Sequence, residues 1–203
     1  MISEWLAFLE LGFRHIVAWD AADHILFLLV LAAIYRVPDW RAALWVISAF
    51  TVGHSISLLL AVTGALVLPS GVVEFLIPVT IVATGVENLI LRERAASGRS
   101  ARHRPLFAGL FGIVHGAGFA GYLQGLFMDH LAVPLLGFNL GIEAGQVVVL
   151  AVAAVGFAAA DRLLAHVPAA GRGLPDAFQL RVVGVSALVT VVATAWAVAR
   201  YPA

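Results

Sequence analysis

The stretch HIVAWDAADHILFLLVLAAIY, residues 15–35, combines two properties that rarely occur together. It is as long and as apolar as a helix that crosses a bilayer, which needs about 20 residues. Its first half nevertheless carries two aspartates and two histidines. A charged side chain at the centre of a membrane helix costs about 2.5 to 3.5 kcal/mol on insertion scales. The stretch therefore predicts a membrane helix whose polar side chains face a bundle interior or a binding site.

The whole chain has the composition of a membrane protein. Of its 203 residues, 62% are hydrophobic and 12% are charged, whereas soluble proteins average about 25% charged residues. The net charge is zero and lysine is absent, which argues against a surface that binds nucleic acid. The absence of cysteine excludes disulfides and thiolate metal sites. We expect a single all-α transmembrane domain over residues 1–203.

Hydropathy and helix-breaking residues predict a polytopic bundle of about six transmembrane helices. The N-terminal MISEWLAFLELGF lacks the basic region and the cleavage motif of a signal peptide. We therefore expect a short amphipathic segment there, leading into the first span. The six spans are expected near residues 14–35, 41–68, 72–91, 105–127, 134–163 and 180–200.

The arginines are distributed unevenly over the predicted connections. All twelve cations are arginine, and only Arg14 and Arg200 fall outside the first, third and fifth connections or their borders. Cytoplasmic loops of membrane proteins carry the excess of positive charge. These three connections are therefore expected in the cytoplasm, with both termini outside.

Polar side chains recur at membrane depth in five of the six predicted spans. Asp20, Asp23 and His24 are spaced to share one face of a helix, and the polar residues of 139–146 repeat this spacing in the fifth span. In the expected orientation, the histidines of the second and fourth spans lie near mid-membrane, at a depth that both stripes reach. We predict one shared metal site formed by Asp20, Asp23, His24, His54, His115, Asn139 and Glu143, with His15, Ser55, Glu87, Asn88 and Gln146 as further candidates.

The predicted ligands are imidazole, carboxylate and amide groups, without a thiolate. This set suits a borderline divalent metal such as nickel, cobalt, zinc or iron(II) better than copper(I). We expect four buried carboxylates and no buried arginine in the spans, so that a cation is needed to balance the charge. Glu87 and Asn88 are expected nearer the cytoplasm, at an inner gate or, alternatively, among the headgroups. His15 has the same interfacial alternative, and His103 is expected on the solvated surface.

The intramembrane histidines and glycines are also compatible with alternatives to a transported metal. A lone histidine in a membrane helix is often held by a hydrogen bond to a neighbouring helix. The glycine-rich stretch 109–125 fits close helix packing, or a backbone that unwinds beside a cavity. A membrane subunit that holds a static metal or haem is a second functional hypothesis, and a hydrolase in which His115 serves Ser55 or Ser57 as the base is a third. No nucleotide-binding loop is present, so ATP is not expected as the direct energy source.

Five ordered blocks resemble the HupE/UreJ membrane proteins: HIVAWDAADHILFLL, FTVGHSISLLLA, VEFLIPVTIVATGVENL, FGIVHGAGFAGYL and FNLGIEAGQ. Members of that family are regarded as nickel permeases associated with hydrogenase and urease systems. The resemblance implies a non-enzymatic, multi-pass protein of the bacterial inner membrane that takes up nickel or cobalt as its substrate. The first two blocks are also similar to nickel/cobalt transporters, which implies metal-handling roles for Asp23 with His24 and for Gly53 with His54 and Ser55. Expected partners are the lipid bilayer, the metal ion and a homo-oligomer or larger membrane complex.

Overall fold

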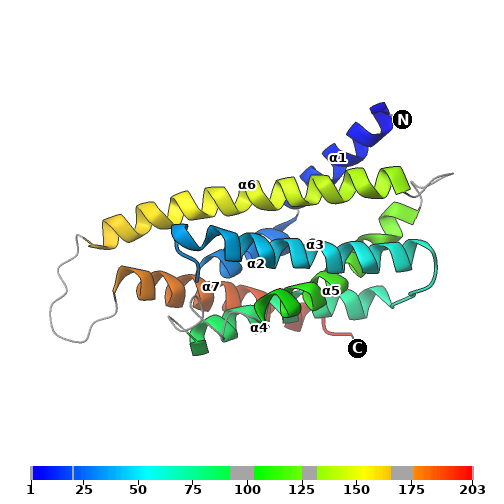
Figure 1. Cartoon of the computed structure of the whole chain (residues 1–203). Coiled ribbons are helices and arrows are strands. Elements are labelled where there is room, and N and C mark those ends of the chain that lie inside the picture. The colour runs from blue at the N-terminus through cyan, green and yellow to red at the C-terminus, as the bar shows by residue number, and fades with distance from the viewer. Residues whose placement is uncertain (1, 20, 92–102, 125–131, 166–175, 203) are drawn as a thin grey trace.

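The chain folds into a bundle of helices (Figure 1). The computed structural model describes residues 2–19, 21–91, 103–124, 132–165 and 176–202. All regular structure in these residues is helical. The elements are α1 (Ile2–Val17), α2 (Ala22–Ala32), the short 3-10 helix η1 (Val37–Asp39), α3 (Trp40–Val62), α4 (Ser70–Leu91), α5 (Arg104–Gln124), α6 (Ala132–Ala165) and α7 (Ala177–Ala199).

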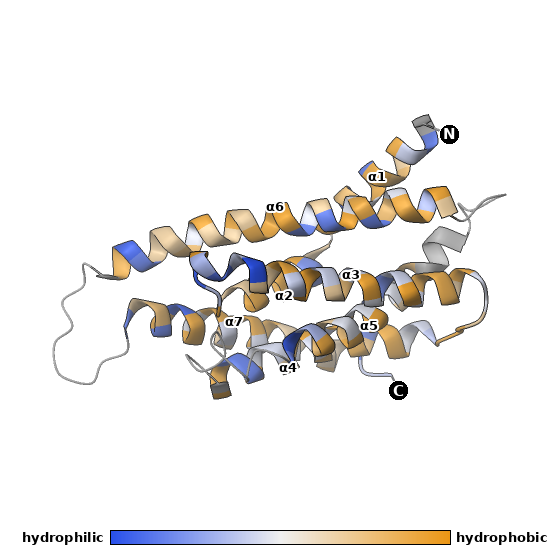
Figure 2. Cartoon of the chain, viewed as in Figure 1, coloured by the Kyte–Doolittle hydropathy of each residue, from blue (hydrophilic) through white to orange (hydrophobic). Residues whose placement is uncertain are grey.

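Three helix pairs make the most extensive contacts: α3 with α5, α1 with α6, and α4 with α7. The shorter α2 contacts α4, α6 and α7 and so lies among the pairs. Phe27, Phe50 and Phe138 are among the largest fully buried side chains and form part of one core. Figure 2 shows that the long helices are mostly hydrophobic, with hydrophilic residues gathered at the left-hand ends of α3, α6 and α7.

Four helices are long and apolar enough to cross a membrane. A fifth span results if the bent pair Glu4–Val17 and Ala22–Ala32, whose axes differ by 67°, is counted as one broken span. Helix α5 does not meet this test over its described residues. The expected all-α fold is thus confirmed in the described residues, with four to five candidate membrane spans where about six were predicted. The four candidate spans are Val37–Val62, Ser70–Ile90, Ala132–Leu164 and Ala177–Ala199.

The prediction of one continuous helix over residues 14–35 is wrong. Helix α1 ends at Val17 and α2 begins at Ala22, while Ala21 has the non-helical angles φ −84° and ψ 33°. The break lets α1 pack along α6 while α2 packs among α4, α6 and α7. On one straight helix, His15 and His24 would be about 13.5 Å apart along the axis, but their ring centroids are 4.7 Å apart. The bend therefore brings two histidines together that a straight helix separates.

The second span also ends earlier than expected. Helix α3 ends at Val62, whereas the prediction extended it to residue 68. Gly64 has φ 74°, in the left-handed region that glycine adopts without a steric penalty. Glycine in this conformation just beyond a helix is a common terminator. The apolar stretch of the sequence thus extends beyond Val62, where the helix itself ends.

Close helix crossing accounts for the glycines of α5. A Cβ atom on Gly112 would lie 2.1 Å from the Phe50 carbonyl oxygen, and one on Gly116 would lie 2.3 Å from the His54 carbonyl oxygen. Neither position has room for a side chain, because both oxygens belong to the backbone of α3. Helix α5 runs without interruption over Arg104–Gln124. The alternative in which its backbone unwinds beside a cavity is therefore not found in these residues.

We expect Gly112→Ala to lower the free energy of unfolding by about 1–3 kcal/mol, the range for overpacked cores. Alanine is the better helix former, so the loss would come from the crossing and not from helix propensity. The matched control is Gly156→Ala on α6, where a Cβ would meet no atom within 4 Å. Thermal unfolding of the detergent-solubilised protein measures both variants. Equal thermal unfolding midpoints for Gly112→Ala and Gly156→Ala would contradict a close crossing of α5 and α3 at Gly112.

Candidate metal centre

Three histidines from three helices converge inside the bundle. His15 lies near the end of α1, His24 in the first turn of α2, and His54 in the middle of α3. Each offers one ligand atom, and these atoms all lie within 4.8 Å of one another. In a tetrahedral site with metal–nitrogen bonds of about 2.0–2.1 Å, neighbouring nitrogens are roughly 3.3 Å apart. Small ring rotations therefore suffice for these three side chains, the histidine trio, to hold one ion.

Several nitrogens of this group have no hydrogen-bond partner among the described residues. They are Nε2 of His24 and both ring nitrogens of His54, a residue that is 0% exposed. An unsatisfied buried polar group typically costs about 1–3 kcal/mol, and such groups are rare in native proteins. Neutral imidazole is a common metal ligand. A bound cation would remove this cost at the lone-pair nitrogens.

His115 adds a fourth imidazole from α5. Its ring centroid lies 5.2 Å from that of His24. Its Nε2 atom is 3.1 Å from the Thr80 hydroxyl oxygen, and its Nδ1 atom is buried without a hydrogen-bond partner among the described residues. The trio and His115 together are called the histidine cluster below.

A cavity of about 610 Å³ reaches the cluster from one end of the bundle. Three of the four histidines line it, together with the acidic side chains of Asp23 and Glu74. Asp23 accepts a hydrogen bond of 3.1 Å from Arg200 near the end of α7. Carboxylates at the mouth of a cavity attract cations. We call this cavity the vestibule.

The polar residues of α6 pair with α3. Ser48 donates a hydrogen bond of 2.5 Å to Glu143, and Thr51 donates one of 2.9 Å to Gln146. Asn139 Oδ1 is buried without a hydrogen-bond partner among the described residues. Glu143 and Gln146 are therefore held by hydroxyl donors of α3. Among the histidine and carboxylate side chains of the described residues, the three ligand atoms that converge all come from histidines.

Ser55 and Asp20 are two further residues of the predicted site. Ser55 donates a hydrogen bond of 2.6 Å to the Thr51 carbonyl oxygen, one turn earlier in the same helix. No hydrogen bond joins Ser55 to a histidine among the described residues, and Ser57 Oγ is buried there without a hydrogen-bond partner. A hydrogen-bonded serine–histidine pair, as hydrolysis requires, is therefore not found in this part of the chain. Asp20 lies outside the described residues.

Glu87 and Asn88 belong to a polar network far along α4 from the vestibule. Arg104 donates a hydrogen bond of 2.8 Å to Asn88 and lies 3.4 Å from Glu87. Asn88 donates one of 2.6 Å to the Val30 carbonyl oxygen. His103 Nε2 is 2.6 Å from Glu87, and its side chain is 35% exposed. His103 thus lies at the surface, as expected, and also contacts the Glu87 carboxylate.

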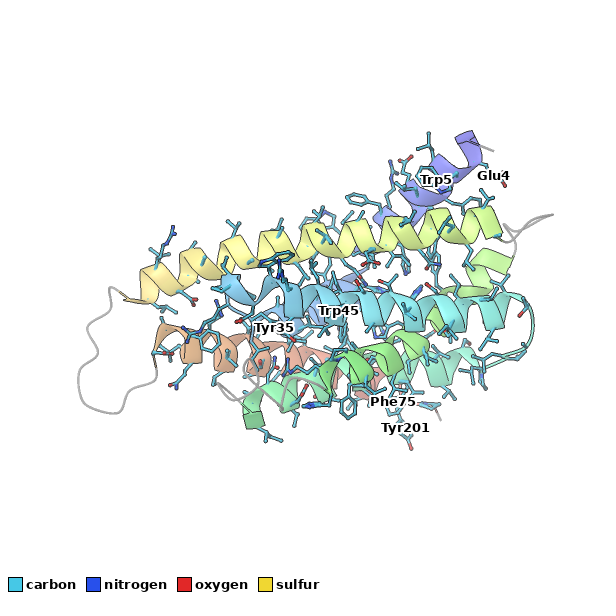
Figure 3. The ribbon with its side chains drawn as sticks, viewed as in Figure 1. Glu4, Trp5, Tyr35, Trp45, Phe75 and Tyr201 are labelled. Atoms are coloured by element: carbon cyan, nitrogen blue, oxygen red, sulfur yellow. The ribbon has the colours of Figure 1, made fainter. Side chains whose placement is uncertain are left out.

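The expectation of no buried arginine is also wrong. Arg104 is 4% exposed and Arg181 is 7% exposed. Arg181 donates a hydrogen bond of 2.6 Å to Asp161, and further bonds to the carbonyl oxygens of Ala33 and Tyr35. Tyr35 is labelled in Figure 3, between α3 and α7 in this view. Arg181 is buried because the Asp161 carboxylate and free carbonyls beyond the end of α2 bind it, and Arg104 is held by Glu87 and Asn88. We call this part of the bundle the arginine end.

Three phenylalanines lie between the histidine cluster and the arginine end. The ring centroids of Phe27 and Phe50 are 4.9 Å apart, and Phe111 lies 6.4 Å from Phe27. Phe50 is also 5.1 Å from His115. Towards Glu87, the next space holds only about 20 Å³, close to the volume that one water needs. This aromatic layer separates the histidine cluster from the arginine end, so the vestibule is the side from which the cluster is accessible.

Comparison with known families identifies the family of the chain. A family model described as HupE / UreJ protein matches residues 1–200. The chain belongs to the HupE/UreJ family. Comparison with curated proteins and with solved structures returns no match. The HupE/UreJ family is associated in general with nickel and cobalt uptake, and the matched range includes every helix that contributes to the histidine cluster.

Sequence reasoning overlooked two parts of this HupE/UreJ site. Thr80 contacts His115, but a hydroxyl in an apolar helix carries no charge that would single it out. The phenylalanines of the aromatic layer resembled ordinary core residues. A usable signal was present for Phe50, which stands one helical turn before His54 and therefore on the same face of α3.

Proposed function

We propose that this protein is a membrane permease for a divalent transition-metal cation, nickel or cobalt, and that the histidine cluster binds the ion in transit. His54 is the observation that carries the proposal. It is fully buried, neither ring nitrogen has a hydrogen-bond partner among the described residues, and it lies beside two other histidines. A structural histidine in a core is normally held by at least one hydrogen bond. The general association of the family with nickel and cobalt uptake supports the same substrate class.

The arrangement supports a route with distinct steps. The ion enters the vestibule, where Glu74 attracts it and where Asp23 is paired with Arg200. It then exchanges water ligands for imidazole nitrogens, which bind nickel and cobalt well. To leave, it passes the aromatic layer and the pair of Glu87 with Arg104. Glu87 and Arg104 must separate to let the ion pass. We therefore assign the structure to a state in which the cluster is open to the vestibule and closed at the arginine end. Alternating access requires such a state.

The proposed membrane topology has six spans. They are the four candidate helices, the bent pair α1–α2, and α5. We place the arginine end in the cytoplasm and both termini outside, because cytoplasmic ends carry the excess of arginine. The membrane is the bacterial inner membrane. The bilayer, the metal ion and further subunits or copies of the chain are its partners, and neither nucleotide nor nucleic acid takes part.

Transport into proteoliposomes tests this function. We expect saturable uptake of radioactive nickel into vesicles that contain the protein, above the level in protein-free vesicles. Unlabelled cobalt should compete, whereas magnesium should not, because magnesium prefers oxygen ligands and dehydrates reluctantly. Nickel that stays bound to the protein without entering the lumen would overturn the permease and indicate a static metal subunit. A haem absorption band in the purified protein would indicate the haem-binding alternative.

A further inference from the structure

The two hydrogen-bond contacts of Thr80 determine which ring nitrogen of His115 carries the hydrogen. Thr80 on α4 is buried, at 6% exposure. Its hydroxyl donates a hydrogen bond of 2.7 Å to the Ile77 carbonyl oxygen and lies 3.1 Å from His115 Nε2. A hydroxyl has one hydrogen to donate and two lone pairs. Since a carbonyl oxygen only accepts, Ile77 takes that hydrogen, and Thr80 presents a lone pair to His115.

It follows that His115 donates in the contact with Thr80. Its Nε2 atom therefore carries the hydrogen, and in neutral imidazole the lone pair then resides on Nδ1. Nδ1 is the buried His115 nitrogen without a hydrogen-bond partner among the described residues. The ring that carries it is the one 5.2 Å from His24. The atom left free is thus the one chemically able to bind a cation.

We propose that Thr80 is a positioning residue, which fixes His115 as the Nε2–H tautomer and thereby presents its Nδ1 lone pair to the transported ion as a fourth nitrogen ligand. This inference rests on the proposed function of the cluster. A partner that holds the second ring nitrogen sets both tautomer and ring orientation, and loss of such a partner typically costs 10- to 100-fold in metal affinity, as an order of magnitude. Thr80 acts through His115 and need not touch the ion itself.

The test compares three variants of α4 by nickel binding to the purified protein. Thr80→Val has nearly the same shape but no hydroxyl, and should weaken nickel binding roughly 10- to 100-fold. Thr80→Ser keeps the hydroxyl and should bind within about threefold of wild type. Thr84→Val is the matched control, because Thr84 is equally buried and its hydroxyl donates to a carbonyl of its own helix. Equal affinities for the two valine variants would overturn the role of Thr80.

A spectroscopic readout separates positioning from packing. Nitrogen NMR of metal-free protein with labelled histidine rings reports the tautomer of each ring, and His115→Gln identifies the signals of His115. We expect the Nε2–H tautomer in wild type and Thr80→Ser, and a mixture in Thr80→Val. An Nδ1–H tautomer in wild type would overturn the inference. If these experiments fail while His54→Leu still abolishes uptake, only the role of Thr80 is wrong; if His54→Leu transports normally, the proposed function itself fails.

Discussion

His54→Leu is expected to reduce nickel uptake by at least about 100-fold, because it removes a ligand from the centre of the histidine cluster. Loss of a residue that merely supports a metal ligand already costs roughly 10- to 100-fold. Leucine has a similar size, so the packing of α3 against α5 should be retained. Uptake into proteoliposomes, normalised to inserted protein, measures the effect. Uptake at the wild-type rate would contradict a route through His54.

The same substitution should leave the metal-free protein at least as stable as wild type. Both ring nitrogens of His54 are buried without a hydrogen-bond partner among the described residues, and each such atom typically costs about 1–3 kcal/mol. Leucine removes both costs, so the thermal midpoint should not fall. A clear drop in the midpoint would mean that His54 has a structural partner. Natural proteins often accept lower stability at sites that function requires.

Added nickel should make wild type more stable than His54→Leu. A ligand that binds only the folded state stabilises it by about 2.7 kcal/mol at a hundredfold excess over its Kd. Nickel should therefore raise the thermal midpoint of wild type and leave that of His54→Leu unchanged. Leu58→Ile, one turn further along α3 and fully buried, is the control. It should keep both the uptake and the nickel-dependent shift, because this exchange changes shape without removing a ligand.

The sequence allowed three histidines of the cluster to be predicted together, but it did not indicate the position of the fourth. Polar groups in apolar helices must face a protein interior, so the approach of His24, His54 and His115 followed from their depth and residue type. The position of His15 did not, because no proline or glycine marks the break between Val17 and Ala22. That break depends on packing: α1 lies mainly along α6, while α2 packs among α4, α6 and α7.

Rotation about a helix axis was harder to predict than depth along it. Glu143 has the depth expected for a metal ligand, yet it pairs with Ser48 of α3. Several polar residues at one depth allow several pairings, and the sequence alone does not choose among them. Arg181 was misjudged for a related reason. Counted with a loop, it was expected near water, whereas helix ends with free carbonyls and Asp161 accept it into the bundle.

Arg181→Met is accordingly expected to lower the free energy of unfolding by about 1–3 kcal/mol, the cost of leaving buried hydrogen-bond partners unsatisfied. Asp161 would lose a hydrogen bond of 2.6 Å, and the carbonyl oxygens of Ala33 and Tyr35 would lose donors at 3.2 and 3.1 Å. Unfolding of the detergent-solubilised protein measures the change. Arg41→Met is the control, because Arg41 is exposed, and it should stay within about 0.5 kcal/mol of wild type.

A second substitution divides this loss into two causes. Adding Asp161→Asn to Arg181→Met removes the carboxylate that was left without its cation, so part of the stability should return. The remainder measures the anchoring of Ala33 and Tyr35, which ties the end of α2 to the start of α7. The histidines lie near the opposite end of α2, so nickel binding per folded molecule should be the same in both variants. If Arg181→Met were no more destabilising than Arg41→Met, the pair with Asp161 would have to be solvated, and the arginine end would be open to water rather than packed.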